Sequence, residues 1–192
     1  ARQIDLVKDF LTRFKTEKTK VLVDPVMGDY GSLYPSFSEE LAGRMHELLS
    51  YADLLTPNLT EACILAGASF REDFSQQELE ALCETLSESG PSSIVVSGIH
   101  LGDEIGNFVW SDGKSELLTT KRVGPCRSGT GDVFSAILAA DLVNGVPLKA
   151  SVQKAASFIS KTMAYTQKLG VPETDGICFE QYLWELGKET AT

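Results

Sequence analysis

The clearest folding signal in this chain is Ala52-Asp53-Leu54-Leu55-Thr56-Pro57-Asn58-Leu59-Thr60-Glu61. Its first five residues are a short apolar run, which is typical of a buried strand of a parallel sheet. The next five begin a short helix that we expect to end near Gly67, because Asn58 and Glu61 have the spacing of a capping box. The stretch therefore predicts a strand followed directly by a helix.

The same alternation extends along the chain on both sides. Short apolar runs at 20–24 and 93–97 predict two more buried strands, the second ended by Gly98, and Ser36 resembles the first residue of a capping box before a helix. The turn Ser111-Asp112-Gly113-Lys114 predicts a β-hairpin within 104–122. Further helices are predicted at the N-terminus and at 74–87, 130–143, 148–168 and 179–186. This order predicts an α/β fold, a three-layer sandwich with a mainly parallel sheet flanked by helices, and antiparallel strands at one side.

Length and the first residues bear on domain organisation. The 192 residues suit a single domain spanning 1–192. Ala1 lies inside what reads as an amphipathic helix, and natural proteins rarely begin there. We therefore expect that residues precede Ala1 and that the chain is the C-terminal part of a larger domain.

The net charge argues against some classes of binding partner, and the cysteine content indicates the cellular compartment. Seventeen Lys and Arg stand against 27 Asp and Glu, a formal net charge of -10. This acidity argues against binding to nucleic acid or to an anionic membrane surface, and no apolar run approaches the ~20 residues of a membrane span. The four cysteines are widely spaced, which argues against a zinc site or a disulfide framework and indicates a reducing, cytoplasmic location.

The stretch Gly129-Thr130-Gly131-Asp132 is the first candidate for chemistry. Two glycines at the start of a helix allow backbone N–H groups to point at one spot, where the helix dipole favours an anion. Asp132, in the first turn, is then a candidate base for a hydroxyl held beside a phosphoryl group. The alternative is a tight turn followed by an Asp that the dipole favours, and the four residues alone leave both open.

Polar residues also follow the three predicted strands, at the edge of the sheet where ligands bind. Asn58 and Glu61 form a structural capping box or, alternatively, offer an amide and a carboxylate of the kind that suits Mg²⁺. Asp24 and Asp29 could serve a cation, while Asp24 could instead cap a turn before Pro25. Tyr34 could donate to a phosphate or only pack its ring.

Missing motifs exclude several enzyme classes. The chain has no Walker-type phosphate loop and lacks the protein-kinase signatures. Its two histidines, His46 and His100, have no Gly-x-Ser-x-Gly partner, so a hydrolase triad is not indicated. We expect His46 to be a surface residue and Cys126 a small buried thiol, although a nucleophilic role for Cys126 is the alternative.

Taken in order, the segments beginning at Asp24, Thr56, Val95 and Gly129 resemble the ribokinase-like superfamily over nearly the whole chain. Within it the sequence is most similar to the pyridoxal (vitamin B6) kinases, a likeness based on Gly28-Asp29 and the following Gly31-Ser32-Leu33-Tyr34. The hydroxymethylpyrimidine kinases of thiamine synthesis share Asp-Pro-Val-Met and Thr-Pro-Asn-x-x-Glu. They usually continue with Lys-Ser-Gly, where this chain has Asp29-Tyr30-Gly31.

This resemblance implies phosphorylation of the 5'-hydroxymethyl group of a B6 vitamer by MgATP. A hydroxymethylpyrimidine kinase and a non-catalytic nucleotide-binding fragment are the alternatives. The resemblance implies Asp132 as general base and the amides of Gly129, Thr130 and Gly131 as the site of the developing charge. The resemblance also implies that Glu61, Thr56 and Asp24 bind Mg²⁺. It implies contacts with the ATP phosphates from Asp24, Asn58, Asp29, Tyr34 and Ser97. Val123 and Pro125 are implied to lie near the adenine.

The resemblance also implies a homodimer and leaves a monovalent-cation requirement open, although we find no exposed apolar stripe that requires a dimer. The part of the family that supplies most of the vitamin pocket is not in this sequence. The segment 124–128 matches no family pattern, and Arg127 is a further candidate for a phosphate contact.

Overall fold

A computed structural model describes residues 2–187 of the chain. These residues form two compact units, which are described separately. The first comprises the described residues up to Leu101 together with Gly106–Leu118. The second comprises Gly102–Ile105 together with the described residues from Thr119 onward. The single domain expected over 1–192 stays a prediction.

A five-stranded sheet has the order β1-β4-β5-β6-β7. Its strands are β1 (Leu22–Val23), β4 (Leu54–Leu55), β5 (Ser93–Leu101), β6 (Glu104–Ser111) and β7 (Lys114–Lys121). Strand β4 pairs in parallel with both β1 and β5, with Leu54 opposite Leu22 and Ser93. Asp112 and Gly113 join β6 to β7 with φ of 50° and 71°, the positive values that a two-residue hairpin turn requires. The predicted hairpin is confirmed.

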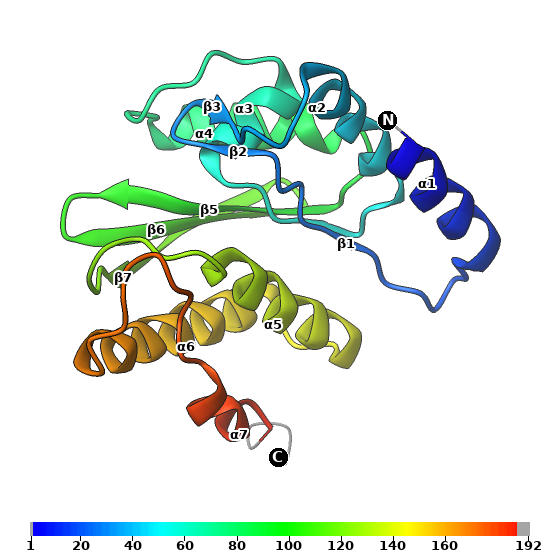
Figure 1. Ribbon diagram of the computed structural model, residues 1–192. Helices are drawn as coiled ribbons and strands as arrows, with labels where there is room; N and C mark the ends of the chain where they lie inside the picture. Colours follow the sequence, from blue (N-terminus) through cyan, green and yellow to red (C-terminus); the bar gives the residue numbers. More distant parts are fainter. Residues whose placement is uncertain (1, 188–192) are drawn as a thin grey trace. The chain divides into compact units, whose positions relative to one another are not determined.

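The first unit also contains several helices. They are α1 (Arg2–Phe14), α2 (Glu39–Met45), the 3-10 helix η1 (His46–Tyr51), α3 (Leu59–Ala66) and α4 (Gln76–Ser87), and a small second sheet pairs β2 (Gly28–Asp29) with β3 (Ser32–Leu33). Both α3 and α4 contact β5 (Figure 1). Helix α3 ends at Gly67, whose φ of 67° closes the helix in the left-handed region.

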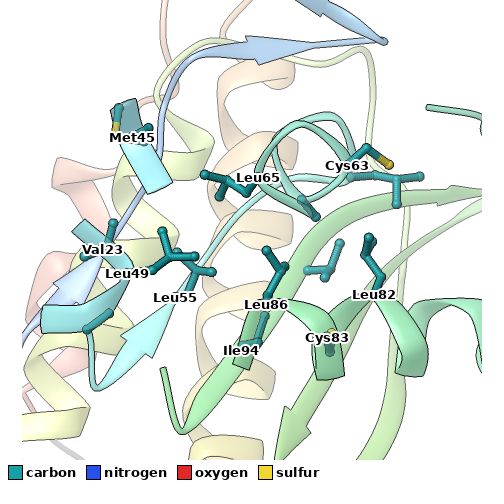
Figure 2. Packing of buried hydrophobic residues seen from close by; sticks show 14 of the residues in the cluster. Val23, Met45, Leu49, Leu55, Cys63, Leu65, Leu82, Cys83, Leu86 and Ile94 are labelled. Carbon is teal, nitrogen blue, oxygen red and sulfur yellow. The ribbon is translucent and has the colours of Figure 1, made fainter. Parts of the chain in front are cut away.

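The core of the first unit explains why its parallel strands are short apolar runs. Leu55 and Ile94, from β4 and β5, are fully buried with Leu49, Cys83 and Leu86 from the covering helices (Figure 2). Burying a Leu or Ile side chain contributes about 1.5–3 kcal/mol, so even strands of two residues are firmly placed. The predicted fold class is confirmed: the chain is an α/β protein with a mainly parallel sheet flanked by helices.

The second unit is built on α5 (Thr130–Asn144) and α6 (Leu148–Lys168), which lie side by side and are followed by η2 (Glu180–Tyr182) and α7 (Leu183–Leu186). Lys154 of α6 forms an ion pair with the buried Asp141 of α5 at 2.5 Å. Even α6, which has 21 residues, is not apolar enough to cross a membrane, and neither is any other described helix.

Two predicted boundaries were wrong because a local signal was overridden. Strand β5 continues through Gly98 to Leu101, since a glycine tolerates the φ of 70° found there and its N–H donates to Asn107 Oδ1 at 3.4 Å. Helix α2 is capped by Ser38, not by Ser36, because the Ser38 hydroxyl accepts from the N–H of Leu41.

Helix α1 carries exposed apolar side chains, although no exposed apolar stripe was expected from the sequence. Ile4 is buried, and the pairs Lys8–Glu47 and Arg44–Asp5 join the same side of α1 to α2 and η1. Arg44 and Lys8 hold the pKa of Glu47 at about 2. Leu6, Val7, Phe10 and Phe14 are nevertheless exposed, so the chain does carry an apolar stripe at its surface.

The different exposure of the cysteines allows the packing of the protein to be tested by their reactivity. Cys63 and Cys83 are buried, and burial raises the pKa of Cys83 to about 12, whereas Cys126 is exposed, contrary to the buried thiol expected from sequence. We expect iodoacetamide to alkylate Cys126 in the native protein at least tenfold faster than Cys63 or Cys83, because only an accessible thiolate reacts. Mass spectrometry of timed digests measures this order. Equal rates at Cys83 and Cys126 would contradict the packing around α4.

Candidate active site

Three predicted polar positions lie at the same edge of the sheet, although only two of them follow the end of a strand. Asp24 follows β1, Thr56 follows β4, and Ser97 lies within β5. The N–H of Thr56 donates to Val23 O at 3.0 Å, and the N–H of Ser97 donates to Pro57 O at 2.9 Å. Asn58 and Ser97 pair as an isolated parallel bridge. The structure therefore brings these side chains to one edge of the first unit.

Glu61 forms the capping box that the sequence predicts. Asn58 Oδ1 accepts from the N–H of Glu61 at 2.9 Å, and Glu61 Oε2 accepts from the N–H of Asn58 at 2.8 Å. The second carboxylate oxygen, Oε1, accepts from the N–H of Met27 at 3.1 Å. Only 3% of Glu61 is exposed. Its carboxylate thus fixes both the start of α3 and the chain that leaves β1.

Burial makes this carboxylate hard to ionise. It raises the pKa of Glu61 to about 7, an effect that the hydrogen bonds from backbone N–H groups only partly offset and that the nearby charge of Asp24 increases. A cation beside the two carboxylates would relieve both penalties.

The fit of Mg²⁺ follows from this donor set. Residues 2–187 contain no group of three or more His, Cys, Asp or Glu side chains arranged to hold a metal ion. Mg²⁺ usually keeps several waters and needs only one or two carboxylates, so Glu61 and Asp24 fit it. The buried Thr56 hydroxyl, the third predicted ligand, donates to Val23 O at 3.4 Å.

The segment from Gly28 to Tyr34 is fixed to the same helix. Gly28 O accepts from Asn58 Nδ2 at 2.7 Å, and the N–H of Gly31 donates to Thr60 Oγ1 at 2.9 Å. Asp29 and Tyr34, the two predicted nucleotide contacts of this segment, are exposed. Their side chains are therefore accessible on a backbone that the first turn of α3 holds.

In the second unit, α5 begins as the glycine motif predicts. Gly129 is its N-cap with φ of 85°, the Thr130 hydroxyl donates to Arg127 O at 3.1 Å, and Asp132 is exposed in the first turn. No side chain among the described residues caps this helix, in contrast to α3. Its first N–H groups thus keep the capacity to bind an anion. Val123 and Pro125, predicted near the adenine, are partly buried in the loop before it.

Arg127 does not have the role considered for it. Its guanidinium is buried and donates to the carbonyl oxygens of Val171 at 2.7 Å, of Asp175 at 3.3 Å and of Pro172. These bonds fasten the segment that follows α6 to the loop before α5. The suggested phosphate contact was wrong because the partners of Arg127 lie more than 40 residues away, where no local pattern points to them.

Sequence reasoning also missed Thr60, which is 1% exposed and bonds to the segment that carries Asp29. The spacing of 29 residues between Thr60 and Gly31 left no local signal. That the residues of the first unit and Asp132 of the second act in one site stays a prediction.

Comparison with known proteins decides the family. Residues 1–176 match the phosphomethylpyrimidine kinase family. The chain belongs to this family. A hydroxymethylpyrimidine/phosphomethylpyrimidine kinase of Haemophilus influenzae is 32% identical over 176 residues, which are 88% of this chain and 64% of that relative. The chain therefore spans less than two thirds of that family member's length.

Solved structures of similar proteins include this family and the pyridoxal kinases. A candidate phosphomethylpyrimidine kinase from Bacteroides thetaiotaomicron is 28% identical, and the match covers 96% of this chain and 65–66% of that one. Its TM-score is 0.92 in one crystal form and 0.88 in a form with pyridoxal. Pyridoxal kinase from Lactobacillus plantarum is 25% identical with a TM-score of 0.86, over 95% of this chain and 66% of that one. The ribokinase-like architecture expected from the sequence agrees with these neighbours.

The raised pKa of Glu61 predicts a pH dependence of stability. Between its reference value of 4.5 and about 7, the folded protein holds a proton on Glu61 that the unfolded chain releases, so this group makes folding less favourable as pH rises. Wild type should lose about 2 kcal/mol more unfolding free energy between pH 5 and pH 8 than Glu61→Gln does.

Urea unfolding at the two pH values measures this difference, and the exposed Glu84→Gln serves as the matched control. The control should change with pH as wild type does. An identical pH dependence in wild type and Glu61→Gln would show that Glu61 ionises normally in the fold.

Proposed function

We propose that the protein containing this chain is an ATP-dependent kinase that phosphorylates the hydroxymethyl group of a small heteroaromatic alcohol, with a hydroxymethylpyrimidine as preferred acceptor. The family match over residues 1–176 carries this proposal. The Haemophilus influenzae relative, named for both hydroxymethylpyrimidine and phosphomethylpyrimidine, supports the choice of acceptor. The B6 vitamer favoured by the sequence resemblance becomes the second candidate.

Pyridoxal stays a candidate because of two specific observations. One crystal form of the Bacteroides thetaiotaomicron protein contains pyridoxal, and a pyridoxal kinase is among the structural neighbours. The chain also has Asp29-Tyr30-Gly31 at the position where hydroxymethylpyrimidine kinases usually have Lys-Ser-Gly. Both acceptors present a hydroxymethyl group on a flat nitrogen heterocycle, so the same transfer chemistry serves either.

In the proposed reaction, the carboxylate of Asp132 accepts the proton of the hydroxymethyl group. The hydroxyl oxygen bonds to the γ-phosphorus of ATP, and the bond from that phosphorus to the bridging oxygen breaks, which releases ADP. The N–H groups of Gly129, Thr130 and Gly131 stabilise the charge on the transferring group. The uncapped start of α5 and the exposure of Asp132 support these roles.

The remaining roles belong to the first unit. We assign Mg²⁺ binding through water to Glu61, Asp24 and Thr56, and Mg²⁺ would neutralise charge on the phosphates when bound. Asp24, Asn58, Asp29, Tyr34 and Ser97 would face the phosphates, and Val123 and Pro125 of the second unit would lie near the adenine. The homodimer and the monovalent-cation requirement stay predictions.

The acceptor is tested with the whole protein to which this chain belongs. We expect kcat/KM with a hydroxymethylpyrimidine to exceed that with pyridoxal by at least tenfold in a coupled assay of ADP release. The reverse ratio would establish the second candidate. Absence of ATP-dependent phosphorylation of both alcohols would refute the proposed function.

The base is tested by Asp132→Asn, which keeps the size of the side chain but removes its basicity. We expect kcat to fall by about 10²–10⁴-fold while the Kd of MgATP changes less than threefold. Asp112→Asn, the same change at the exposed hairpin turn, is the control and should retain wild-type kcat. If Asp132→Asn kept more than a tenth of wild-type kcat, the proton would have another acceptor.

A further inference from the structure

The segment that carries Asp29 and Tyr34 is too short to hold its own shape. We call residues 28–34 the Gly28 loop. It contains β2 and β3, which have two residues each, and an isolated two-stranded hairpin is at best marginally stable in water. Its turn places Tyr30 at φ of 50° and Gly31 at 77°, and the left-handed region disfavours a bulky residue such as tyrosine. The shape of the loop must therefore come from contacts outside it.

The first turn of α3 supplies these contacts at two levels. At the base of the loop, Glu61 accepts from the N–H of Met27, and Asn58 donates to Gly28 O. At the tip, the hydroxyl of Thr60 accepts from the N–H of Gly31 at 2.9 Å. Thr60 is thus the helix residue that holds the turn itself, and it does so without belonging to the capping box.

Two aromatic contacts also hold the tip of the Gly28 loop. Gly31 lies against the ring of Phe70 so closely that a Cβ on it would come within 2.6 Å of Phe70 Cδ1. The ring of Tyr30 meets that of His100 edge to face, with centroids 5.9 Å apart. Both contacts help to locate the tip. The hydrogen bond to Thr60 is directional and therefore sets the orientation of the turn.

We propose that Thr60 is a positioning residue for nucleotide binding: its hydroxyl holds the Gly28 loop in the one conformation that presents Asp29 and Tyr34 to the phosphates. The inference rests on the proposed function, which assigns those two side chains to ATP. Thr60 itself is 1% exposed, so it acts through the loop backbone and does not touch the substrate.

Three variants of the protein that contains this chain test the inference. Thr60→Val keeps the side-chain shape but removes the acceptor, Thr60→Ser restores the hydroxyl, and Thr85→Val makes the same change on the exposed side of α4, where the hydroxyl bonds to Ala81 O. Thr60→Val should raise the KM for ATP about tenfold and leave the KM for the alcohol within twofold. Thr60→Ser and Thr85→Val should both remain within twofold of wild type.

Hydrogen exchange adds a readout that a change in global stability would not produce. The Gly31 amide should exchange at least tenfold faster in Thr60→Val, while amides of β4 and β5 keep their wild-type rates. If Thr60→Val does not fold, Thr60→Ala replaces it, because alanine adds no methyl group in place of the hydroxyl. Faster exchange at Gly31 with an unchanged KM for ATP would overturn the proposal, as would a Thr60→Ser enzyme as impaired as Thr60→Val.

Failure of the proposed function is recognised separately. If wild type phosphorylates neither alcohol, the Kd of MgATP from calorimetry replaces KM, and the same order of variants is expected. A Kd that is equal in wild type, Thr60→Val and Thr60→Ser would overturn the positioning role whether or not the enzyme is active.

Discussion

The buried carboxylate of Glu61 is the interaction on which the candidate site depends. One oxygen closes the capping box with Asn58, and the other accepts from Met27, the residue that leads into the Gly28 loop. Without this group, the partly buried N–H of Asn58 and the buried N–H of Met27 would each lose their acceptor. The same burial raises the pKa of Glu61 to about 7, so a positive charge beside it would favour its ionised form.

This double use changes how the Asn58 and Glu61 motif is interpreted. The sequence presents a capping box and a metal ligand as alternatives, but a carboxylate has lone pairs for both. The cap uses one acceptor position on Oε2 and the N–H of Met27 uses one on Oε1, and together the two bonds hold the side chain in place. The structural role is therefore compatible with the proposed cation binding, because a ligand that is already immobilised loses little entropy on binding.

The predictions that held are those encoded by neighbouring residues. The apolar runs gave β1, β4 and β5, the spacing of Asn58 and Glu61 gave the cap of α3, and Asp112-Gly113 gave the hairpin. Two local signals were overridden, at the cap expected at Ser36 and at the strand end expected at Gly98. The phosphate contact suggested for Arg127 failed because its partners, the carbonyls around Asp175, lie far along the chain. The bond from Gly31 to Thr60 went unpredicted for the same reason, since tertiary contacts leave no periodicity in the sequence.

The two helix N-termini show why a glycine motif and a capping box serve different ends. In α3 the capping box satisfies the N–H groups of Asn58 and Glu61, and side chains of the same turn bond to the Gly28 loop. In α5 the cap residue is Gly129, which has no side chain to offer, and the donors of the first turn stay available. Glycine at an N-cap costs only a few tenths of a kcal/mol relative to Ser or Asp, and the φ of 85° at Gly129 is one that glycine adopts most readily. The glycine therefore leaves the first-turn donors of α5 open to an anionic ligand at little cost to the helix, which supports the proposed site.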